Sequence, residues 1–242
     1  MKKHKICLLL TACIAPPQTT QKLNRHKAEE REQDYYTALQ QWLPMGYPIV
    51  FCESSLYQSE RIQALVAQYP HQVEYLSFMT QKSVLGKGNG EAEILEYAFE
   101  HSTFVQETEW VAKVTGRLFV PNFKQVLGDL SQYAQAQVIS DLNIFLSYAD
   151  TRLVIFRPSF YPYFQHFFDQ INENQGLYFE HAFVKAIHLC LTEHLHAWRM
   201  FAEKPIIVGI SGTSNELYGY PNVAQRLRIR LAHALKKYLV SK

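Results

Sequence analysis

Short apolar runs alternate with longer amphipathic segments along most of the chain. The longer segments repeat apolar residues every three or four positions, as a helix with one buried face does. In residues 25–43, for example, Tyr35, Leu39 and Leu43 recur at every fourth position. Strands that alternate with helices predict an α/β fold with a mixed, mainly parallel sheet flanked by helices. The predicted strands are residues 6–14, 48–52, 73–78, 110–114, 118–120, 137–143, 153–156 and 205–210.

Further amphipathic segments predict the remaining helices, and the length fits one domain that spans residues 1–242. Its last part, residues 221–242, is predicted to be a basic amphipathic helix that Asn222 caps. The aromatic segment 160–171 has two interpretations, either a core helix or one wall of an acceptor pocket. The other predicted helices are residues 57–68, 91–100, 123–133 and 182–195.

Composition excludes several classes of protein. Hydrophobic residues make up 48% of the chain and charged residues 19%, so the chain is not a disordered one. The formal net charge of +2 is too small for general binding of polyanions, so no nucleic-acid partner is expected. The four cysteines form no CxxC pair and no metal-ligand spacing.

The N-terminal apolar run has two interpretations. Residues 6–13 follow a basic start, and Leu10 to Cys13 resembles the lipobox of a lipoprotein. However, the run is at the short limit for a signal sequence and has the length of a buried first strand. We favour the strand, and with it a cytoplasmic protein, over a lipoprotein attached through Cys13.

The segment from Glu109 to Asn122 carries the most informative chemistry. Lys113 and Arg117 flank a predicted turn at Thr115-Gly116. A glycine at a turn lets the backbone approach a ligand closely, and two neighbouring cations suit an anionic group such as a diphosphate. The alternative is a β-hairpin whose charges are solvated.

A glycine-rich segment, residues 86–90 (Gly-Lys-Gly-Asn-Gly), is predicted to be a loop that opens the helix 91–100. Free N–H groups at such a helix start bind anions. The segment is neither a Walker loop nor a clean GxGxxG motif, so it is informative only together with Lys87 and the cations of the neighbouring turn. Glu53, at the end of a predicted strand, can bind a ribose or base edge, or cap the next helix.

Several blocks of the chain, in their order and spacing, resemble a bacterial glycosyltransferase-like family of capsule and lipopolysaccharide O-antigen clusters. The resemblance implies a GT-A-like (Rossmann-like) fold, a nucleotide-sugar donor, and a saccharide or lipid-linked acceptor. The blocks are Leu8 to Ile14, Arg25 to Tyr35, Val50 to Ser55, Gly86 to Glu93, Lys-Val-Thr-Gly-Arg at 113–117, and Pro205 to Thr213. The residues expected to bind the donor are Thr11, Arg31, Glu53, Lys87, Gly88, Gly90, Glu91, Lys113, Thr115, Gly116 and Arg117.

Glycosyl transfer requires that the leaving diphosphate be neutralised and, in an inverting reaction, that a base deprotonate the acceptor. The chain has no Asp-x-Asp motif, so the lysine and arginine of the 113–117 block are expected to replace a metal ion, and no metal ligand or other cofactor is assigned. We predict that Glu180 is the catalytic base, with Asp141 as the second candidate. Glu180 as a plain helix cap is the alternative. Tyr178, His181 and Arg157 are expected to bind the acceptor.

Two further possibilities stay open from the sequence. The first is a protein that binds a nucleotide or glycan without turnover. The second is a kinase or nucleotidyltransferase, which would be expected to show a Walker loop or clustered Asp residues, and the sequence shows neither.

The terminal helix pairs basic residues such as Arg226 and Lys237 with leucines, which predicts contact with the inner membrane. The alternative is a helix packed on the domain with its charges in water.

Overall fold

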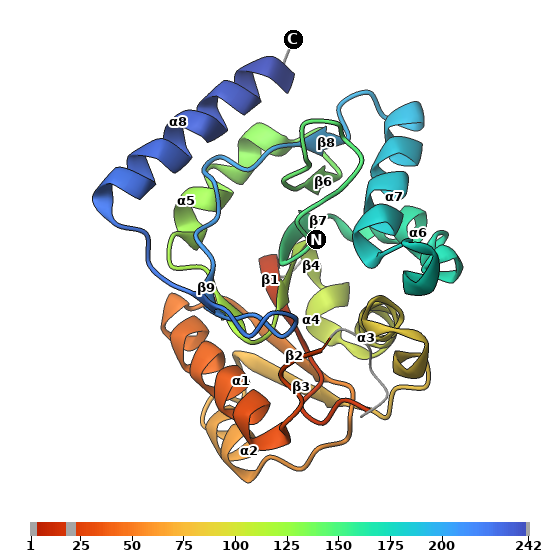
Figure 1. The fold of residues 1–242 in the computed structure, drawn as a ribbon, viewed down its shortest axis with the longest axis vertical. Helices are drawn as coiled ribbons and strands as arrows, with labels where there is room; N and C mark the ends of the chain where they lie inside the picture. The colour runs from red at the N-terminus through yellow and green to blue at the C-terminus, as the bar shows by residue number, and fades with distance from the viewer. Residues whose placement is uncertain (1–3, 18–22, 241–242) are drawn as a thin grey trace.

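A seven-stranded mixed sheet forms the centre of the computed structural model, which describes residues 4–17 and 23–240 (Figure 1). The strand order is β3-β2-β1-β4-β7-β6-β8. A separate three-stranded sheet has the order β10-β9-β5. In chain order the strands are β1 His4–Ala12, β2 Ile49–Glu53, β3 Val73–Ser77, β4 Thr108–Thr115, β5 Leu118–Phe119, β6 Val138–Ile139, β7 Leu153–Phe156, β8 Trp198–Arg199, β9 Val208–Ile210 and β10 Leu217–Tyr218.

One strand of the large sheet, β7, runs opposite to the others. Strands β3, β2, β1 and β4 are parallel, whereas β7 pairs antiparallel with β4 and β6 pairs antiparallel with β7. The chain moves from β1 to β2 and β3 on one side, then returns to β4 on the other side of β1. The strand order therefore reverses between β1 and β4, and open α/β sheets bind ligands beyond the carboxyl ends of the strands at such a point.

Helices cover both faces of the large sheet, because successive side chains of a strand point to opposite faces. In β1, Cys7 and Leu9 pack with α3, α6 and α7, whereas Leu8 and Leu10 pack with α1, α2 and α5. The α-helices are α1 Ala28–Trp42, α2 Glu60–Ala67, α3 Lys87–His101, α4 Thr103–Gln106, α5 Phe123–Leu127, α6 Tyr161–Gln165, α7 Phe179–Glu193 and α8 Val223–Val240. Short 3-10 turns cover Leu43–Met45, Ser83–Leu85, Leu130–Tyr133, Pro158–Phe160, Phe168–Gln170 and Glu173–Gln175.

The predicted α/β fold, with a mixed and mainly parallel sheet flanked by helices, is confirmed. The N-terminal apolar run forms β1, which pairs with β2 on one side and β4 on the other. The lipoprotein alternative at Cys13 requires removal of this run, and the sheet would then lose β1 from between β2 and β4.

Four local predictions were wrong. Residues 86–90 are not a loop, since α3 already begins at Lys87. The helix α2 is capped by the hydroxyl of Ser59 and not by Glu53. The helix predicted over 123–133 ends early, because Gly128 adopts a φ of 56° directly after α5. Finally, 110–120 is not a hairpin, since β5 pairs with β9 and not with β4.

The aromatic segment 160–171 belongs to the core, as the first of its two interpretations states. Phe160, Phe164 and Phe168 are buried, and Phe164 packs edge-on against Phe179 and Phe183 of α7. These rings fill the space between α7 and the sheet, so the segment supports the cleft from behind and does not line it.

The C-terminal helix α8 lies at the edge of the molecule (Figure 1). Most of its residues are exposed, with His233 the buried exception. None of the helices in residues 4–17 and 23–240 is long and apolar enough to cross a membrane.

Gly116 is required where β4 ends beside β1. Its N–H donates to the carbonyl oxygen of Thr11 at 2.9 Å, and a Cβ at this position would lie only 2.7 Å from that oxygen. Because the neighbouring atom belongs to the backbone, the strands must move apart to admit a side chain. We expect Gly116→Ala to lower the free energy of unfolding by about 1–3 kcal/mol, measured by urea denaturation.

Gly219→Ala is the matched control, since a Cβ there would meet no atom within 4 Å. Equal stability of the two variants would contradict the close approach of β1 and β4 at Gly116.

Candidate functional site

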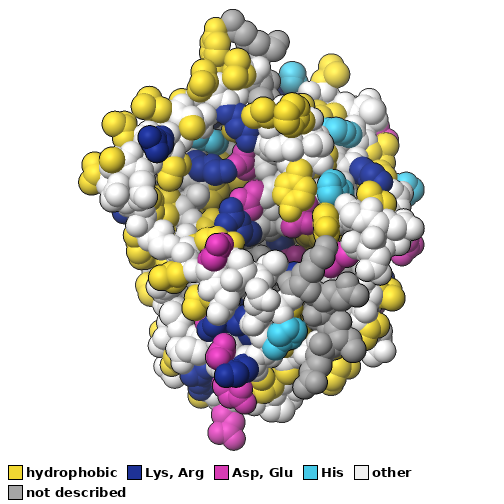
Figure 2. Space-filling model, viewed as in Figure 1, with side chains coloured by type: hydrophobic (Ala, Val, Ile, Leu, Met, Phe, Trp, Pro, Cys, Tyr) yellow, Lys and Arg dark blue, Asp and Glu magenta, His cyan; other side chains and the backbone are white. Residues whose placement is uncertain are grey.

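A cleft of about 1090 Å³ opens at the carboxyl ends of β1 and β4, where the strand order reverses. Figure 2 shows basic and acidic side chains gathered around a hollow in the middle of this face. The volume slightly exceeds the range of small-molecule sites, about 300–1,000 Å³. Of the residues predicted from sequence, those that line the cleft are Thr11, Arg31, Lys87, Gly88, Gly90, Glu91, Thr115, Arg117, Tyr178, Glu180 and His181.

Arg31 and Tyr35 shape the wall at the end of β1. The guanidinium of Arg31 donates twice to the carbonyl oxygen of Cys13, at 2.8 and 2.6 Å. The backbone N–H of Cys13 donates to the Tyr35 hydroxyl at 3.1 Å. These bonds from α1 satisfy the backbone where β1 stops, so they fix the direction in which the chain leaves the sheet.

Lys113 lies beneath the cleft and is fully buried, so it does not line the cavity. Its ammonium group forms an ion pair with Glu91 of α3 and donates to the carbonyl oxygen of Thr151 at 2.7 Å. It also lies 5.2 Å from the ring centroid of Phe179, within the range of a cation–π contact. The expectation that Lys113 contacts the donor directly is therefore not supported by its position.

Glu91 connects this buried cation to the cleft. Its carboxylate accepts from the Thr11 hydroxyl at 3.2 Å as well as from Lys113, and its side chain is 24% exposed. A buried charge requires a partner and hydrogen bonds to persist in the protein interior. Lys113 and Glu91 satisfy each other and join the ends of β1 and β4 to α3.

Arg117 and Lys87 provide positive charge at the cleft surface. Arg117 is held by a hydrogen bond of 3.0 Å from its Nε to the carbonyl oxygen of Ile210. A Cβ at Gly212 would lie 2.7 Å from the Arg117 guanidinium, so the glycine gives this side chain room. Lys87 donates to the Thr213 hydroxyl at 3.0 Å. The end of β9 and the segment after it thus position both cations.

Residues 148–152 form a wall that sequence reasoning missed. Arg152 is paired with Asp150 through two hydrogen bonds of 2.8 and 2.6 Å, and its guanidinium lies 5.0 Å from the ring centroid of Tyr218. Because β7 is antiparallel to β4, the residues that precede β7 reach the edge where β4 ends. The polar residues before β7 can be recognised in the sequence, but the antiparallel direction of β7 cannot. Tyr148, Asp150, Thr151 and Arg152 all line the cleft.

Glu180 lies in the first turn of α7 and faces the cleft. Burial raises the pKa of its carboxyl above the ordinary value of 4.5, and the nearby charge of Glu91 adds to this rise. The Thr151 hydroxyl donates to Glu180 at 3.3 Å. Burial and the charge of Glu180 in turn raise the pKa of Tyr148. Since the folded state holds this proton more tightly than the unfolded chain, ionisation of Glu180 costs stability as the pH rises from 4.5 through the raised pKa.

Tyr178 and His181 lie beside Glu180 at the start of α7. The backbone N–H of Tyr178 donates to Nδ1 of His181 at 3.1 Å, so this ring nitrogen caps the helix. The His181 ring also contacts the rings of Tyr178 and Tyr148, with centroids 5.6 and 5.4 Å apart. An aromatic wall of this kind suits the apolar face of a sugar.

The N-terminus of α3 carries a carboxylate of the protein itself. Glu173 accepts from the N–H of Gly88 at 2.7 Å, and a Cβ at Gly86 would lie 3.0 Å from the Glu173 carboxyl carbon. Helix N-termini bind anions, and here a side chain occupies that position. The prediction that glycines at this point bind a ligand therefore stays a prediction.

Three other predicted site residues lie elsewhere. Glu53 is fully buried, and its carboxylate accepts from the N–H groups of Ile14 and Ser55, at 3.0 Å each. Asp141 is paired with Lys204 and Lys236, outside the cleft. The Arg157 guanidinium lies 4.3 Å from the ring centroid of Trp110, at the end of β7 remote from the cleft. These placements do not fit the donor, base and acceptor roles expected of Glu53, Asp141 and Arg157.

Within the described ranges, no three His, Cys, Asp or Glu side chains gather closely enough to hold a metal ion. The carboxylates that line the cleft are instead engaged with cations, hydroxyls or backbone N–H groups. Glu91 with Lys113, Asp150 with Arg152, and Glu173 with Gly88 are the clearest cases.

Comparison with solved structures returns glycosyltransferases and also a protein described as a glucose-1-phosphate thymidylyltransferase from Bacillus anthracis, with a TM-score of 0.44 and 11% identity, covering 97% of this chain and 95% of that one. A glycosyltransferase involved in the glycosylation of the major capsid of PBCV-1 has a TM-score of 0.47 and 9% identity, covering 81% of this chain and 80% of that one. A protein described as a nucleotide-diphospho-sugar transferase from Desulfovibrio desulfuricans G20 has a TM-score of 0.45 and 14% identity, covering 81% and 79%. S. aureus TarS has a TM-score of 0.42 and 10% identity, covering 81% of this chain and 34% of its own. No family model and no curated protein matches the chain.

Because the Lys113–Glu91 ion pair is buried, replacing one of its two charges should strongly lower the free energy of unfolding. Glu91→Gln keeps the side chain's shape but leaves the Lys113 cation without a counter-charge. We expect the free energy of unfolding to fall by about 3–5 kcal/mol, measured by chemical denaturation. Adding Lys113→Met in the Glu91→Gln background removes the uncompensated charge, so stability is expected to recover in part.

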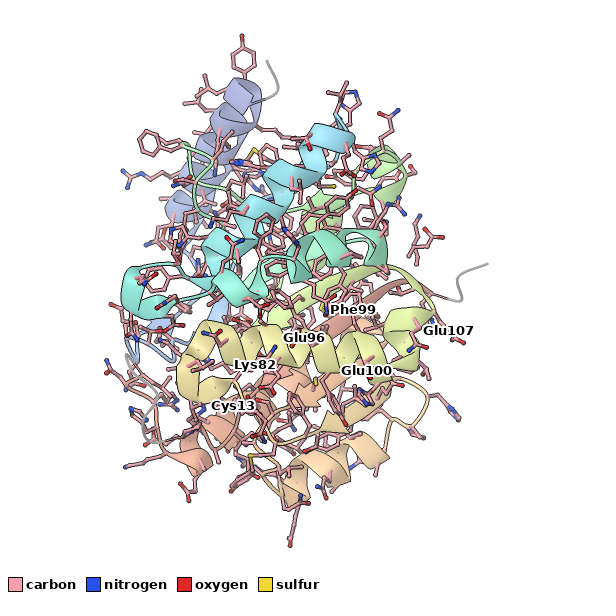
Figure 3. The ribbon with its side chains drawn as sticks, turned by 90° about the vertical axis from the view of Figure 1, so that its right-hand side faces the viewer. Cys13, Lys82, Glu96, Phe99, Glu100 and Glu107 are labelled. Atoms are coloured by element: carbon pink, nitrogen blue, oxygen red, sulfur yellow. The ribbon has the colours of Figure 1, made fainter. Side chains whose placement is uncertain are left out.

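Glu96→Gln is the matched control, because it removes an acid from the same helix. Glu96 pairs with Lys82 at 2.8 Å on the outer surface of α3, where both side chains are partly exposed (Figure 3). Such pairs contribute less than about 1 kcal/mol. Equal losses in the free energy of unfolding for Glu91→Gln and Glu96→Gln would show that the buried ion pair stabilises the fold no more than the surface pair does.

Proposed function

We propose that the protein is a glycosyltransferase that moves a sugar from a nucleotide diphosphate sugar to a saccharide acceptor of the cell surface. The observation that carries this proposal is the composition of one cleft. Arg117 and Lys87 offer positive charge on one side, and Glu180, a carboxylate of raised pKa, lies on another. The transfer needs both, since a diphosphate leaves the donor and the acceptor hydroxyl loses its proton to a base.

The donor is proposed to occupy the part of the cleft next to β1 and β4. The strand order reverses there, and nucleotide sites of open α/β sheets lie at such points. Thr11, Thr115 and Arg31 line this part, and Arg117 follows directly after β4. The guanidinium can hold phosphate oxygens in a bidentate manner, which makes Arg117 the first candidate for the diphosphate.

The acceptor is proposed to occupy the part next to α7. Glu180 is placed there with Tyr148, Tyr178 and His181 around it. A carboxylate as general base accepts the proton of the acceptor hydroxyl while the sugar leaves the diphosphate. The raised pKa of Glu180 brings its basicity closer to that of the attacking acceptor hydroxyl.

The charge released on the diphosphate is proposed to be neutralised by side chains. Arg117 and Lys87 line the cleft, and Arg152 stands on its far wall with Asp150 as partner. Lys113 acts from below, because it holds Glu91 in place and so prevents that carboxylate from repelling the phosphates. The nucleotide and the sugar are to be identified by binding measurements with UDP, GDP, CMP and dTDP sugars.

Arg117→Ala is expected to weaken binding of the preferred nucleoside diphosphate by about 1.5–3 kcal/mol, the contribution of charge-assisted hydrogen bonds. Isothermal titration calorimetry measures this loss directly. Arg61→Ala on α2 is the control, because Arg61 does not line the cleft. Unchanged affinity in Arg117→Ala for each nucleoside diphosphate tested would place the donor elsewhere.

Glu180→Gln is expected to lower kcat by about 10²–10⁴-fold, because the general base is lost, with donor affinity nearly unchanged. Sugar transfer is measured against pH. The wild type should lose activity on the acid side with a midpoint above 4.5, since burial raises the pKa of Glu180. The variant should lack this acid limb.

Glu193→Gln, at the other end of α7, is the control and should keep the parent rate. If Glu180 only caps α7, the Glu180→Gln variant should instead be less stable than the wild type and retain its turnover. A protein that binds the donor but transfers no sugar to any acceptor, with Glu180 intact, would favour binding without turnover.

A further inference from the structure

Helix α8 presents an apolar face to solvent. Leu227, Leu231 and Leu235 follow each other at every fourth position and are 60%, 63% and 61% exposed. Tyr238 and Leu239 continue the face at 55% and 65% exposure. None of these side chains belongs to either core cluster of the domain. Contiguous exposed apolar side chains of this kind mark interaction sites.

The opposite face of α8 attaches the helix to the domain, and it does so with polar groups. The His233 ring lies 3.0 Å from the carbonyl oxygen of Phe201, Lys236 forms an ion pair with Asp141, and Arg230 lies 3.4 Å from Glu203. With 3.6 residues per turn, Leu231 and Leu235 each lie about 200° around the helix from His233. An amphipathic helix normally buries its apolar face against the core, and α8 has the reverse orientation.

Charge distinguishes the partner that fits this face. Residues 223–240 contain no Asp or Glu. By its position on the helix, Arg228 lies within the apolar face. Arg226, Arg230 and Lys237 lie together along one flank of that face. Two copies of this helix facing each other would enclose the Arg228 guanidinium of each copy at the shared apolar face, with no acid of either helix to pair it. An anionic surface satisfies the same charges.

We propose that the apolar face of α8 binds an anionic phospholipid surface. The leucines enter the boundary between headgroups and acyl chains, and the arginine and lysine side chains reach the phosphates. Tyr238 supplies an aromatic ring with a polar end, a side chain suited to the membrane interface. Lys236 and His233 remain on the domain side and keep the helix attached.

The segment that precedes α8 continues the surface toward the cleft. Leu217 and Tyr220 are 75% and 58% exposed, while Tyr218 between them lines the cleft. In the space-filling view, hydrophobic side chains gather over the upper left part of the molecule, where Figure 1 places α8 (Figure 2). Attachment through α8 therefore places the cleft close to the lipid surface. The inference itself does not depend on the reaction that the cleft carries out.

Co-sedimentation of the full chain with vesicles tests the proposal. Mixed phosphatidylglycerol–phosphatidylcholine vesicles are compared with pure phosphatidylcholine vesicles, at low and high salt. We expect the wild type to bind the mixed vesicles, and added salt to weaken binding because charges contribute. The double variant Leu231→Ser/Leu235→Ser should bind the mixed vesicles about tenfold or more weakly, since two buried leucines are lost.

Leu195→Ser is the matched control, because Leu195 is 85% exposed and lies outside α8. Circular dichroism and donor binding of the double variant should equal those of the wild type, since both leucines are outside the core. Equal binding of wild type to mixed and pure phosphatidylcholine vesicles, or equal binding of the double variant, would overturn the proposal. A concentration-dependent dimer in sedimentation velocity that the double variant abolishes would also overturn it, because a second copy would then cover the face.

Discussion

The buried charge of Lys113 is the constraint on which the rest of the site depends. A fully buried ammonium group is costly unless ion pairs and hydrogen bonds compensate it, and every compensating group comes from a different element. Glu91 reaches it from α3, Thr151 from the segment before β7, and Phe179 from α7. One cation thus fixes the relative positions of the elements that surround the cleft.

This arrangement sets the electrostatics of the cleft as well as its shape. Glu91 is held by Lys113 and Thr11, so its carboxylate has a counter-charge at the base of the cavity. Glu180 has no comparable ion pair among the described residues, and burial together with the Glu91 charge raises its pKa. Glu91 and Glu180 are both glutamates in one cleft, and they differ in their chemistry because their surroundings differ. The surface cations Arg117 and Lys87 are held by the end of β9 and by the segment after it.

The sequence predicted much of the fold and part of the site. Short apolar runs specified the parallel strands β1 to β4, since buried strands need continuous apolar residues. The cluster of Lys113, Thr115 and Arg117 was also visible, and so was Glu180 at the start of a helix. The glycine segment was misassigned, because α3 starts four residues earlier than its periodic part and helix ends are the least regular part of the pattern.

The amino-acid sequence by itself determined which segments are strands or helices and which residue types stand at their ends. The tertiary structure alone decided where those ends meet. The antiparallel direction of β7 brings Asp150 and Arg152 into the cleft and moves Arg157 to the far edge, and local periodicity carries no information about strand direction. Similarly, Asp141 and Glu53 looked like free carboxylates, yet long-range partners occupy them. Whether a polar group serves a ligand or the fold depends on neighbours distant in sequence, and folding alone brings those neighbours together.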